Sequence, residues 1–133
     1  MIKRILFVED DARFREVFAS ALGEALASER FEVDFVEVGS LAEARARLRE
    51  GGLDAALIDV TMPDGNGLDL VREINDGGAT SYVPTLVVTA SLENSVAVVA
   101  MDAGARGAIS KLAPMFETVG AIKRLTDAGR QEQ

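Results

Sequence analysis

Short apolar runs and longer segments of helical periodicity alternate five times along the chain. Each apolar run ends in polar residues or glycine, and continuous apolar runs of this kind are typical of buried strands. The run over residues 31–38 alternates apolar and acidic residues in its first half, which is typical of a strand at the edge of a sheet. The runs predict strands over residues 4–8, 31–38, 55–59, 84–90 and 107–110. The segments after them predict helices over residues 12–27, 41–50, 68–74, 94–103 and 114–128. Five strand–helix units with right-handed crossovers favour an α/β fold with a doubly wound, five-stranded parallel sheet.

The spacing of apolar residues within the predicted helices indicates which side of each helix faces the core. The expected core positions are Phe14, Val17, Phe18, Ala21, Leu22, Ala25 and Leu26 in the first helix, Ala97, Val98 and Met101 in the fourth, and Phe116, Val119, Ile122 and Leu125 in the fifth. The fourth helix is apolar on more than one side, so part of its apolar surface is expected to be exposed. Ser40 and Glu43 have the spacing of a capping box at the start of the second helix.

Length, hydropathy and charge limit the class of protein. The chain has 133 residues, of which 48% are hydrophobic, and this fits one domain over residues 1–128 with 129–133 as a polar tail or the start of a linker. No apolar run is long enough to span a bilayer, and the N-terminal residues lack the pattern of a signal peptide, so we expect a cytoplasmic protein without membrane contact. The net charge of −8 argues against nucleic acid as a direct partner of this domain.

The chain contains neither cysteine nor histidine. This excludes disulfides, thiolate nucleophiles, cysteine metal sites and Ser-His-Asp triads, and it removes the usual zinc ligand and general base. Candidate chemistry must therefore come from carboxylates, hydroxyl groups and amines.

Polar side chains follow four of the five predicted strands. Glu9 and Asp10 come after the first strand, Asp59 ends the third, Thr89 lies at the end of the fourth, and Lys111 follows the fifth. Each has a local explanation by itself, such as an acid that opens a turn or a β-branched strand residue. Because open α/β sheets bind ligands at the carboxyl ends of their strands, we expect these five side chains to converge on one crevice.

Three carboxylates in one crevice raise one another's pKa unless a cation offsets their charge. Mg²⁺ is the expected cofactor, since it prefers oxygen ligands and keeps several waters. A carboxylate beside such a cation can attack phosphorus, which makes Asp59 a candidate nucleophile that forms an aspartyl phosphate. The Lys111 ammonium group would neutralise charge in this transfer, and the Thr89 hydroxyl would add a hydrogen bond.

The same residues resemble the motifs of the response-regulator receiver domain, the phosphoacceptor module of two-component signalling, over roughly residues 3–125. The motifs that carry the resemblance are Phe7-Val8-Glu9-Asp10-Asp11, Asp59-x-x-Met62-Pro63 with Gly67, Thr89-Ala90, and Lys111. The resemblance implies a flavodoxin-like receiver fold. It also implies a phosphorylation switch that assists only its own phosphorylation and dephosphorylation and is not a metabolic enzyme.

The resemblance assigns a role to each candidate site residue. The implied Mg²⁺ ligands are Glu9, Asp10, Asp59 and the backbone carbonyl of Thr61. Asp59 is the implied phosphoacceptor, Thr89 the switch hydroxyl, and Lys111 the phosphate-binding lysine. The implied donor is a phosphohistidine on a sensor histidine kinase or a phosphotransfer protein, and the phosphorylated form controls a partner or an attached output domain.

Two positions depart from the common pattern of the family. Leu112 rather than proline follows the lysine, and Lys111-Leu112-Ala113 is closer to receivers that precede a LuxR-like DNA-binding domain. Ala108 stands where the family commonly has Tyr or Phe, whose movement reports the switch. We therefore expect the helix over 94–103 to carry the movement. Its apolar surface, with the fifth strand and fifth helix, is then expected to form a homodimer or bind an effector.

Four other interpretations stay open at this point. The first is the receiver part of a LuxR-like DNA-binding transcriptional regulator, and the second is a degenerate receiver that acts only by docking. A flavodoxin-like cofactor binder has the same topology, although Glu9-Asp10-Asp11 would repel a phosphate. A metal-dependent phosphatase resembling the haloacid-dehalogenase group would carry a second acid where Thr61 stands.

Overall fold

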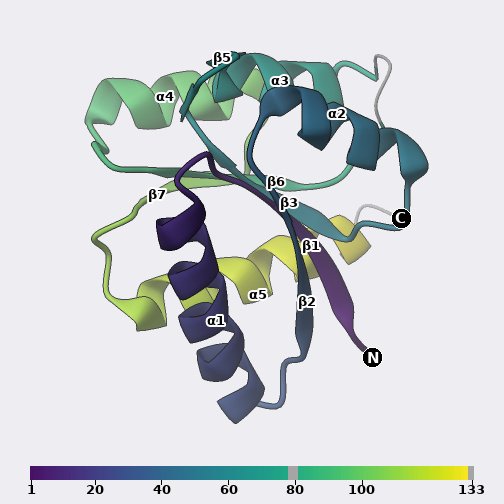
Figure 1. Cartoon of the computed structure of the whole chain (residues 1–133), viewed down its shortest axis with the longest axis vertical. Helices are drawn as coiled ribbons and strands as arrows, with labels where there is room; N and C mark the ends of the chain where they lie inside the picture. The colour runs from purple at the N-terminus through teal and green to yellow at the C-terminus, as the bar shows by residue number, and fades with distance from the viewer. Residues whose placement is uncertain (78–80, 132–133) are drawn as a thin grey trace.

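The computed structural model describes residues 1–77 and 81–131 and shows a central parallel sheet flanked by helices (Figure 1). Five strands form the sheet in the order β2-β1-β3-β6-β7, and every neighbouring pair is parallel. The strands are β1 (Lys3–Val8), β2 (Val33–Val38), β3 (Ala55–Asp59), β6 (Thr85–Thr89) and β7 (Gly107–Ser110). The sequence predicted these five strands with closely similar bounds, and the predicted fold class is confirmed.

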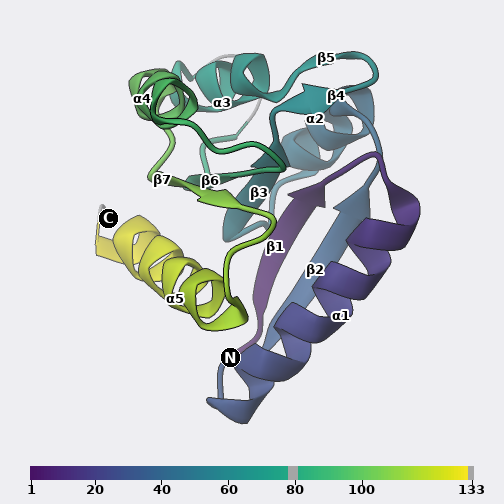
Figure 2. The ribbon, with the colours of Figure 1, turned by 90° about the vertical axis from the view of Figure 1, so that its left-hand side faces the viewer.

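Helices cover both faces of the sheet (Figure 2). α1 (Ala12–Ser28) and α5 (Met115–Gln131) lie on one face, and α2 (Leu41–Glu50), α3 (Gly67–Asn75) and α4 (Asn94–Ala103) lie on the other. α5 continues past the predicted end at residue 128 into the segment predicted as a polar tail. Residues 132–133 of that tail, and Gly78 in the predicted stop of the third helix, lie outside the described residues. Among the helices that the structure describes, none combines the length and the hydropathy needed to cross a membrane.

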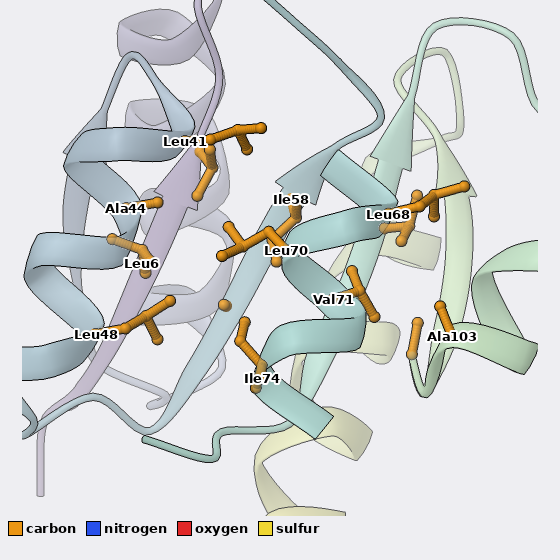
Figure 3. Packing of buried hydrophobic residues seen from close by; sticks show 14 of the residues in the cluster. Leu6, Leu41, Ala44, Leu48, Ile58, Leu68, Leu70, Val71, Ile74 and Ala103 are labelled. Carbon is orange, nitrogen blue, oxygen red and sulfur yellow. The ribbon is translucent and has the colours of Figure 1, made fainter. Parts of the chain in front are cut away.

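Two apolar cores lie between the sheet and its helices. Leu6 and Val8 of β1 point into the core under α2, α3 and α4, whereas Ile5 and Phe7 point into the core under α1 and α5. Figure 3 shows the side chains of α2 and α3 converging on the sheet in the first of these cores. Full burial of such a side chain contributes about 1.5–3 kcal/mol. The two cores therefore fix the strand order and, with it, the position of the strand ends.

Side-chain caps define the start of three helices. Asp11 caps α1 by accepting a hydrogen bond from the Phe14 amide at 3.0 Å. Asn66 caps α3 through the Leu68 amide at 2.8 Å. At α2, Ser40 accepts from the Glu43 amide at 3.1 Å and the Glu43 carboxylate accepts from the Gly39 amide at 3.4 Å. The Ser40 half of the predicted capping box is thus present, whereas the Glu43 carboxylate bonds the amide of Gly39 instead of that of the N-cap residue Ser40.

A short antiparallel hairpin follows β3 and was not predicted. Its strands are β4 (Thr61–Met62) and β5 (Gly65–Asn66), and Pro63 and Asp64 form the turn between them. Two-residue strands are too short to give an alternating pattern. The sequence therefore shows only that proline and glycine interrupt regular secondary structure here.

Several predicted core positions in the helices are wrong. Val17, Val98, Met101 and Phe116 are 62%, 59%, 52% and 75% exposed, and Ala21 is exposed as well. The buried positions that the prediction did not include are Ala19, Ala100, Ala103, Thr118 and Thr126. In α4, apolar residues lie on several sides, so few polar residues mark the solvent face. In α1 the exposed polar residues Arg13, Glu16, Ser20 and Glu24 do mark it, and Val17 and Ala21 lie beside this stripe. The expected exposure of apolar surface on α4 is confirmed, but on a different side of the helix.

Candidate functional site

The ends of four neighbouring strands meet at one edge of the sheet. β1, β3, β6 and β7 are adjacent and parallel, so their carboxyl ends lie together. Asp59 ends β3, Thr89 ends β6, Glu9 and Asp10 follow β1, and Lys111 follows β7. One open pocket is lined by Glu9, Asp10, Asp11, Asp59, Thr61, Met62, Pro63, Thr89, Ala90, Ser91 and Lys111. The structure therefore brings all six predicted site residues to one pocket.

Three carboxylates form an acidic cluster in this pocket. Glu9, Asp10 and Asp59 offer oxygen atoms that all lie within 4.8 Å of one another. Glu9 and Asp59 are only 1% and 5% exposed, whereas Asp10 is open to solvent. Hard divalent cations take oxygen ligands, and Mg²⁺ keeps several waters. A cluster with two buried carboxylates and one exposed carboxylate fits such a cation, with room for waters on the solvent side.

The Lys111 ammonium group pairs with both buried carboxylates. Its Nζ is 3.1 Å from Asp59 Oδ2, forms a second ion pair with Glu9 Oε1, and lies 4.7 Å from the centre of the Phe14 ring. Burial by itself would lower the pKa of Lys111, but the bonds to Glu9 and Asp59 outweigh it and raise that pKa. Burial raises the pKa of Glu9 in spite of the bond from Lys111. Lys111 is therefore held in its charged form beside the candidate phosphoacceptor.

Residues of α1 and β2 hold Glu9 in place. Arg15 Nη1 donates a 2.5 Å hydrogen bond to the Glu9 carbonyl oxygen, and Arg15 Nε lies 3.4 Å from Glu37 Oε1. The Asp11 amide donates to Glu9 Oε2 at 3.0 Å. Sequence reasoning did not identify Arg15 or Phe14 as part of the site. The available signal was their place in the first turn of α1, where side chains point back toward the preceding strand end.

The loop after Asp59 brings backbone groups close to its carboxylate. The Thr61 amide donates to Asp59 Oδ1 at 3.3 Å, and the Gly67 amide donates to the Val60 carbonyl oxygen at 2.7 Å. A Cβ atom at residue 67 would lie 1.9 Å from the Asp59 carbonyl oxygen. Gly67 is thus required by the close approach of two backbone segments.

The last two strands connect Thr89 with Lys111 through their backbones. The Lys111 amide donates to the Thr89 carbonyl oxygen at 2.8 Å. Thr89 Oγ1 accepts a 3.4 Å hydrogen bond from the Ser91 amide, which leaves the hydroxyl proton available for donation. This hydrogen bond joins the ends of β6 and β7 directly beside the pocket.

The charge balance of the pocket decides which ligand can enter. Four acids, three of them in the acidic cluster, line the pocket beside one lysine, so a phosphoryl anion alone would be repelled. A divalent cation held by Glu9, Asp10 and Asp59 would offset that repulsion, and Lys111 would add a second positive charge beside Asp59. This arrangement suits phosphoryl transfer, in which positioning and charge neutralisation matter most.

Known proteins share both the sequence pattern and the fold. A family model described as the response regulator receiver domain matches residues 5–123. The DNA-binding transcriptional activator DevR/DosR of Mycobacterium tuberculosis is 35% identical over 132 residues, which cover 92% of this chain and 57% of that protein. KdpE of Escherichia coli, the KDP operon transcriptional regulatory protein, is 34% identical over 107 residues, which cover 80% of this chain and 44% of that protein. The chain spans about half the length of these curated relatives.

Solved structures agree with the family model. A LuxR-family two-component response regulator from Aurantimonas has a TM-score of 0.82 and 25% identity, covering 96% of this chain and 87% of that chain. The beryllofluoride-activated NtrC4 receiver domain dimer has a TM-score of 0.75 and 26% identity, covering 94% and 97%. Since the family model spans most of the sequence and the strand-end site is in place, the chain belongs to the response regulator receiver domain family of two-component signalling.

Proposed function

We propose that this chain accepts a phosphoryl group on Asp59 from a phosphohistidine donor and then changes conformation to control a partner or an attached output domain. The supporting observation is the ion pair of 3.1 Å between Asp59 and Lys111, in a pocket that also holds Glu9. Receiver domains are generally regulatory, so the chain acts as a switch and assists only its own phosphorylation and dephosphorylation.

The proposal includes Mg²⁺ as the cofactor. Its ligands are Glu9, Asp10, Asp59 and the backbone carbonyl of Thr61. The spacing of the three carboxylates and the solvent exposure of Asp10 support a cation that keeps part of its water shell. When bound, the cation supplies positive charge where the Asp59 carboxylate and a phosphoryl oxygen approach each other.

In the proposed transfer, a carboxylate oxygen of Asp59 forms a bond to phosphorus while the bond from phosphorus to the donor's imidazole nitrogen breaks. The electron pair of that bond passes to the nitrogen, and a mixed anhydride remains on Asp59. Lys111 exchanges its contact with Asp59 Oδ2 for a phosphoryl oxygen. The Thr89 hydroxyl, already on the pocket wall, donates its proton in a hydrogen bond to the phosphoryl group.

The donor histidine must lie outside these 133 residues, because they contain no histidine. We propose a sensor histidine kinase or a phosphotransfer protein in this role, in keeping with the family. The net charge of −8 supports a domain that binds neither nucleic acid nor an anionic membrane directly. A cytoplasmic location stays a prediction.

A homodimer formed through α4, β7 and α5 is the second part of the proposal. Val98 and Met101 of α4 and Phe116 of α5 expose large apolar side chains on these elements. Receiver domains dimerise, and the structural neighbour NtrC4 is a receiver dimer in its beryllofluoride-activated form. Exposed apolar patches mark interaction sites when several such side chains gather.

Phosphorylation of Asp59 is tested with acetyl phosphate as the donor and mass spectrometry of the intact chain. We expect the mass of one phosphoryl group to be added with MgCl₂ and no addition with EDTA, because the acidic cluster repels the donor without a cation. Asp59→Asn should not be labelled, since an amide is not a nucleophile.

Asp69→Asn is the matched control for that experiment. Asp69 is an exposed acid of α3 that pairs with Arg72 outside the pocket, so its replacement should leave labelling unchanged. Labelling of Asp59→Asn at another residue, or labelling of the original chain in EDTA, would refute the proposed site.

A second candidate is the receiver part of a longer DNA-binding transcriptional regulator. The observation that favours it is that this chain matches only 57% of the transcriptional regulator DevR/DosR and 44% of KdpE, so both are considerably longer. Sequencing the reading frame beyond residue 133 separates this candidate from a receiver that acts alone. A degenerate docking module would instead give no labelling. We do not propose a flavodoxin-like cofactor binder or a phosphatase, because the chain belongs to the receiver domain family.

A further inference from the structure

One carboxylate at the tip of the β4–β5 hairpin joins two distant segments of the chain. Asp64 Oδ1 accepts a hydrogen bond from the Leu41 amide at 2.9 Å, and Oδ2 accepts one from the Ala42 amide at 3.0 Å. Both amides belong to the first turn of α2, where a helix lacks internal acceptors for its amide groups. These two bonds lower the pKa of Asp64, so it is ionised at neutral pH.

α2 has a cap of its own and does not depend on Asp64 alone. Ser40 accepts from the Glu43 amide within the capping box. The bonds to Asp64 are additional, and they run from α2 to the loop of the phosphoacceptor. A Cβ atom at Gly65 would be 3.1 Å from the Leu41 side chain, which shows that the hairpin tip lies directly on α2.

The base of the same hairpin lies in the site. Thr61, the first residue of β4, donates its amide to Asp59 Oδ1 and lines the pocket. Among the described residues, the two-residue strands β4 and β5 pair only with each other, and such a hairpin is weakly held by itself. Its position therefore depends on its anchors. At the base these are the Gly67–Val60 bond and the Asn66 cap of α3, and toward the tip they are the buried Met62 side chain and the bonds that Asp64 makes.

We propose that Asp64 is a positioning residue for metal binding. By bonding the start of α2 it holds the β4–β5 hairpin, and through the hairpin it holds the Thr61 carbonyl where the cation needs an oxygen. The inference rests on the proposed function, because that function makes this carbonyl a ligand. Residues that orient a metal ligand directly are worth about 10–100-fold in affinity. Asp64 acts through the hairpin, so we expect a smaller factor.

The test measures the Kd for Mg²⁺ of the full chain without any phosphodonor. MgCl₂ is titrated into ¹⁵N-labelled protein, and the amide signals of residues 59–66 are followed by NMR. Asp64→Ala should raise the Kd by roughly three- to tenfold, below the effect of a direct ligand partner. It should also speed hydrogen exchange at the Gly67 amide, whose 2.7 Å bond to the Val60 carbonyl oxygen closes the base of the hairpin, because the hairpin loosens. Asp64→Asn keeps an accepting oxygen, so its Kd for Mg²⁺ should lie between the Kd of the original chain and that of Asp64→Ala.

Ser40→Ala is the matched control. It removes the other cap of α2 but leaves the tie between the hairpin and the helix, so its Kd should stay within about twofold of the original. Equal Kd increases in Ser40→Ala and Asp64→Ala would overturn the inference, because stability of α2 would then explain both. An unchanged Kd in Asp64→Ala would overturn it as well.

The same titration separates this inference from the function on which it rests. If the original chain does not bind Mg²⁺, the proposed function fails and the inference fails with it. If the original chain binds and Asp64→Ala binds equally well, only the inference is overturned. Should Asp64→Ala fail to fold, Asp64→Asn against Ser40→Ala gives the same comparison.

Discussion

The backbone at Asp59 passes so close to Gly67 that no side chain fits between them. A Cβ atom at residue 67 would meet the Asp59 carbonyl oxygen at 1.9 Å and its carbonyl carbon at 2.9 Å. Backbone atoms of a central strand cannot turn aside as a flexible side chain can. The position of the Asp59 backbone therefore requires glycine at residue 67.

Gly67→Ala should destabilise the chain by about 1–3 kcal/mol, the usual cost of forcing extra atoms into a packed site. Chemical denaturation followed by circular dichroism measures the free energy of unfolding. Gly23→Ala is the control, since a Cβ there lies 3.9 Å from the Phe35 ring, which is an ordinary contact. Inside α1 that change should stabilise by up to about 1 kcal/mol. Equal stabilities for the two variants would contradict the steric account.

At this scale the sequence reveals residues whose chemistry is rare at a strand end. Glu9, Asp59 and Lys111 were identifiable because acids and an amine directly follow apolar runs. Arg15 and Asp64 were not, because their bonds to Glu9 and to the start of α2 go to backbone groups that any residue carries. A contact from a side chain to a distant backbone leaves no mark in composition or spacing.

Among the secondary-structure elements, strands were predicted better than the faces of helices. A strand buried on both sides is a continuous apolar run, and its two ends are polar. The buried side of a helix is recognisable only when the opposite side is polar. α4 fails that condition, and it packs on α3 through the small residues Ala100 and Ala103 rather than through Val98.

α4 is also the element best placed to change conformation when Asp59 is phosphorylated. It follows Thr89 by a short loop, and its N-cap residue Glu93 makes no side-chain capping bond in the described structure. Ala108 on β7 is too small to act as a moving aromatic side chain. Few large buried side chains and an uncapped start both favour local opening.

Beryllofluoride, a phosphoryl mimic, should therefore change hydrogen exchange in α4 more than in most of the chain. The expected result with Mg²⁺ is altered amide exchange over residues 94–103, measured by mass spectrometry at low protein concentration. Residues 20–28 of α1, far from the site along that helix, serve as the internal control and should not change. Unaltered exchange in residues 94–103 would eliminate α4 as the relay.

For the whole molecule, the sequence did not predict the order of the strands in the sheet, and only general rules of topology applied to it. Right-handed crossovers favoured a doubly wound sheet, but they did not say which strands are neighbours. The observed order β2-β1-β3-β6-β7 places the four strands that carry site residues side by side. It also puts β7 at an edge, where α4 and α5 lie on opposite faces of the sheet.

That edge is where we expect two copies of the chain to meet after phosphorylation. Sedimentation equilibrium with Mg²⁺ should show tighter self-association with beryllofluoride than without it. A coupling of about 1–3 kcal/mol, or roughly 5–150-fold in the dimer dissociation constant, is usual for such a switch. The apolar side chains on α4 and α5 supply the surface that becomes buried.

Two charge substitutions locate that interface. Val98→Glu places a carboxylate on the exposed side of α4. It should abolish the tighter self-association that beryllofluoride causes, because burying an unpaired charge in the interface is costly. Val17→Glu adds the same charge at a similarly exposed position of α1, on the other face of the sheet, and should leave that tighter self-association intact. If both variants associate like the original chain, the dimer does not use α4. A mass that stays monomeric at every concentration would mean that a different partner reads the switch.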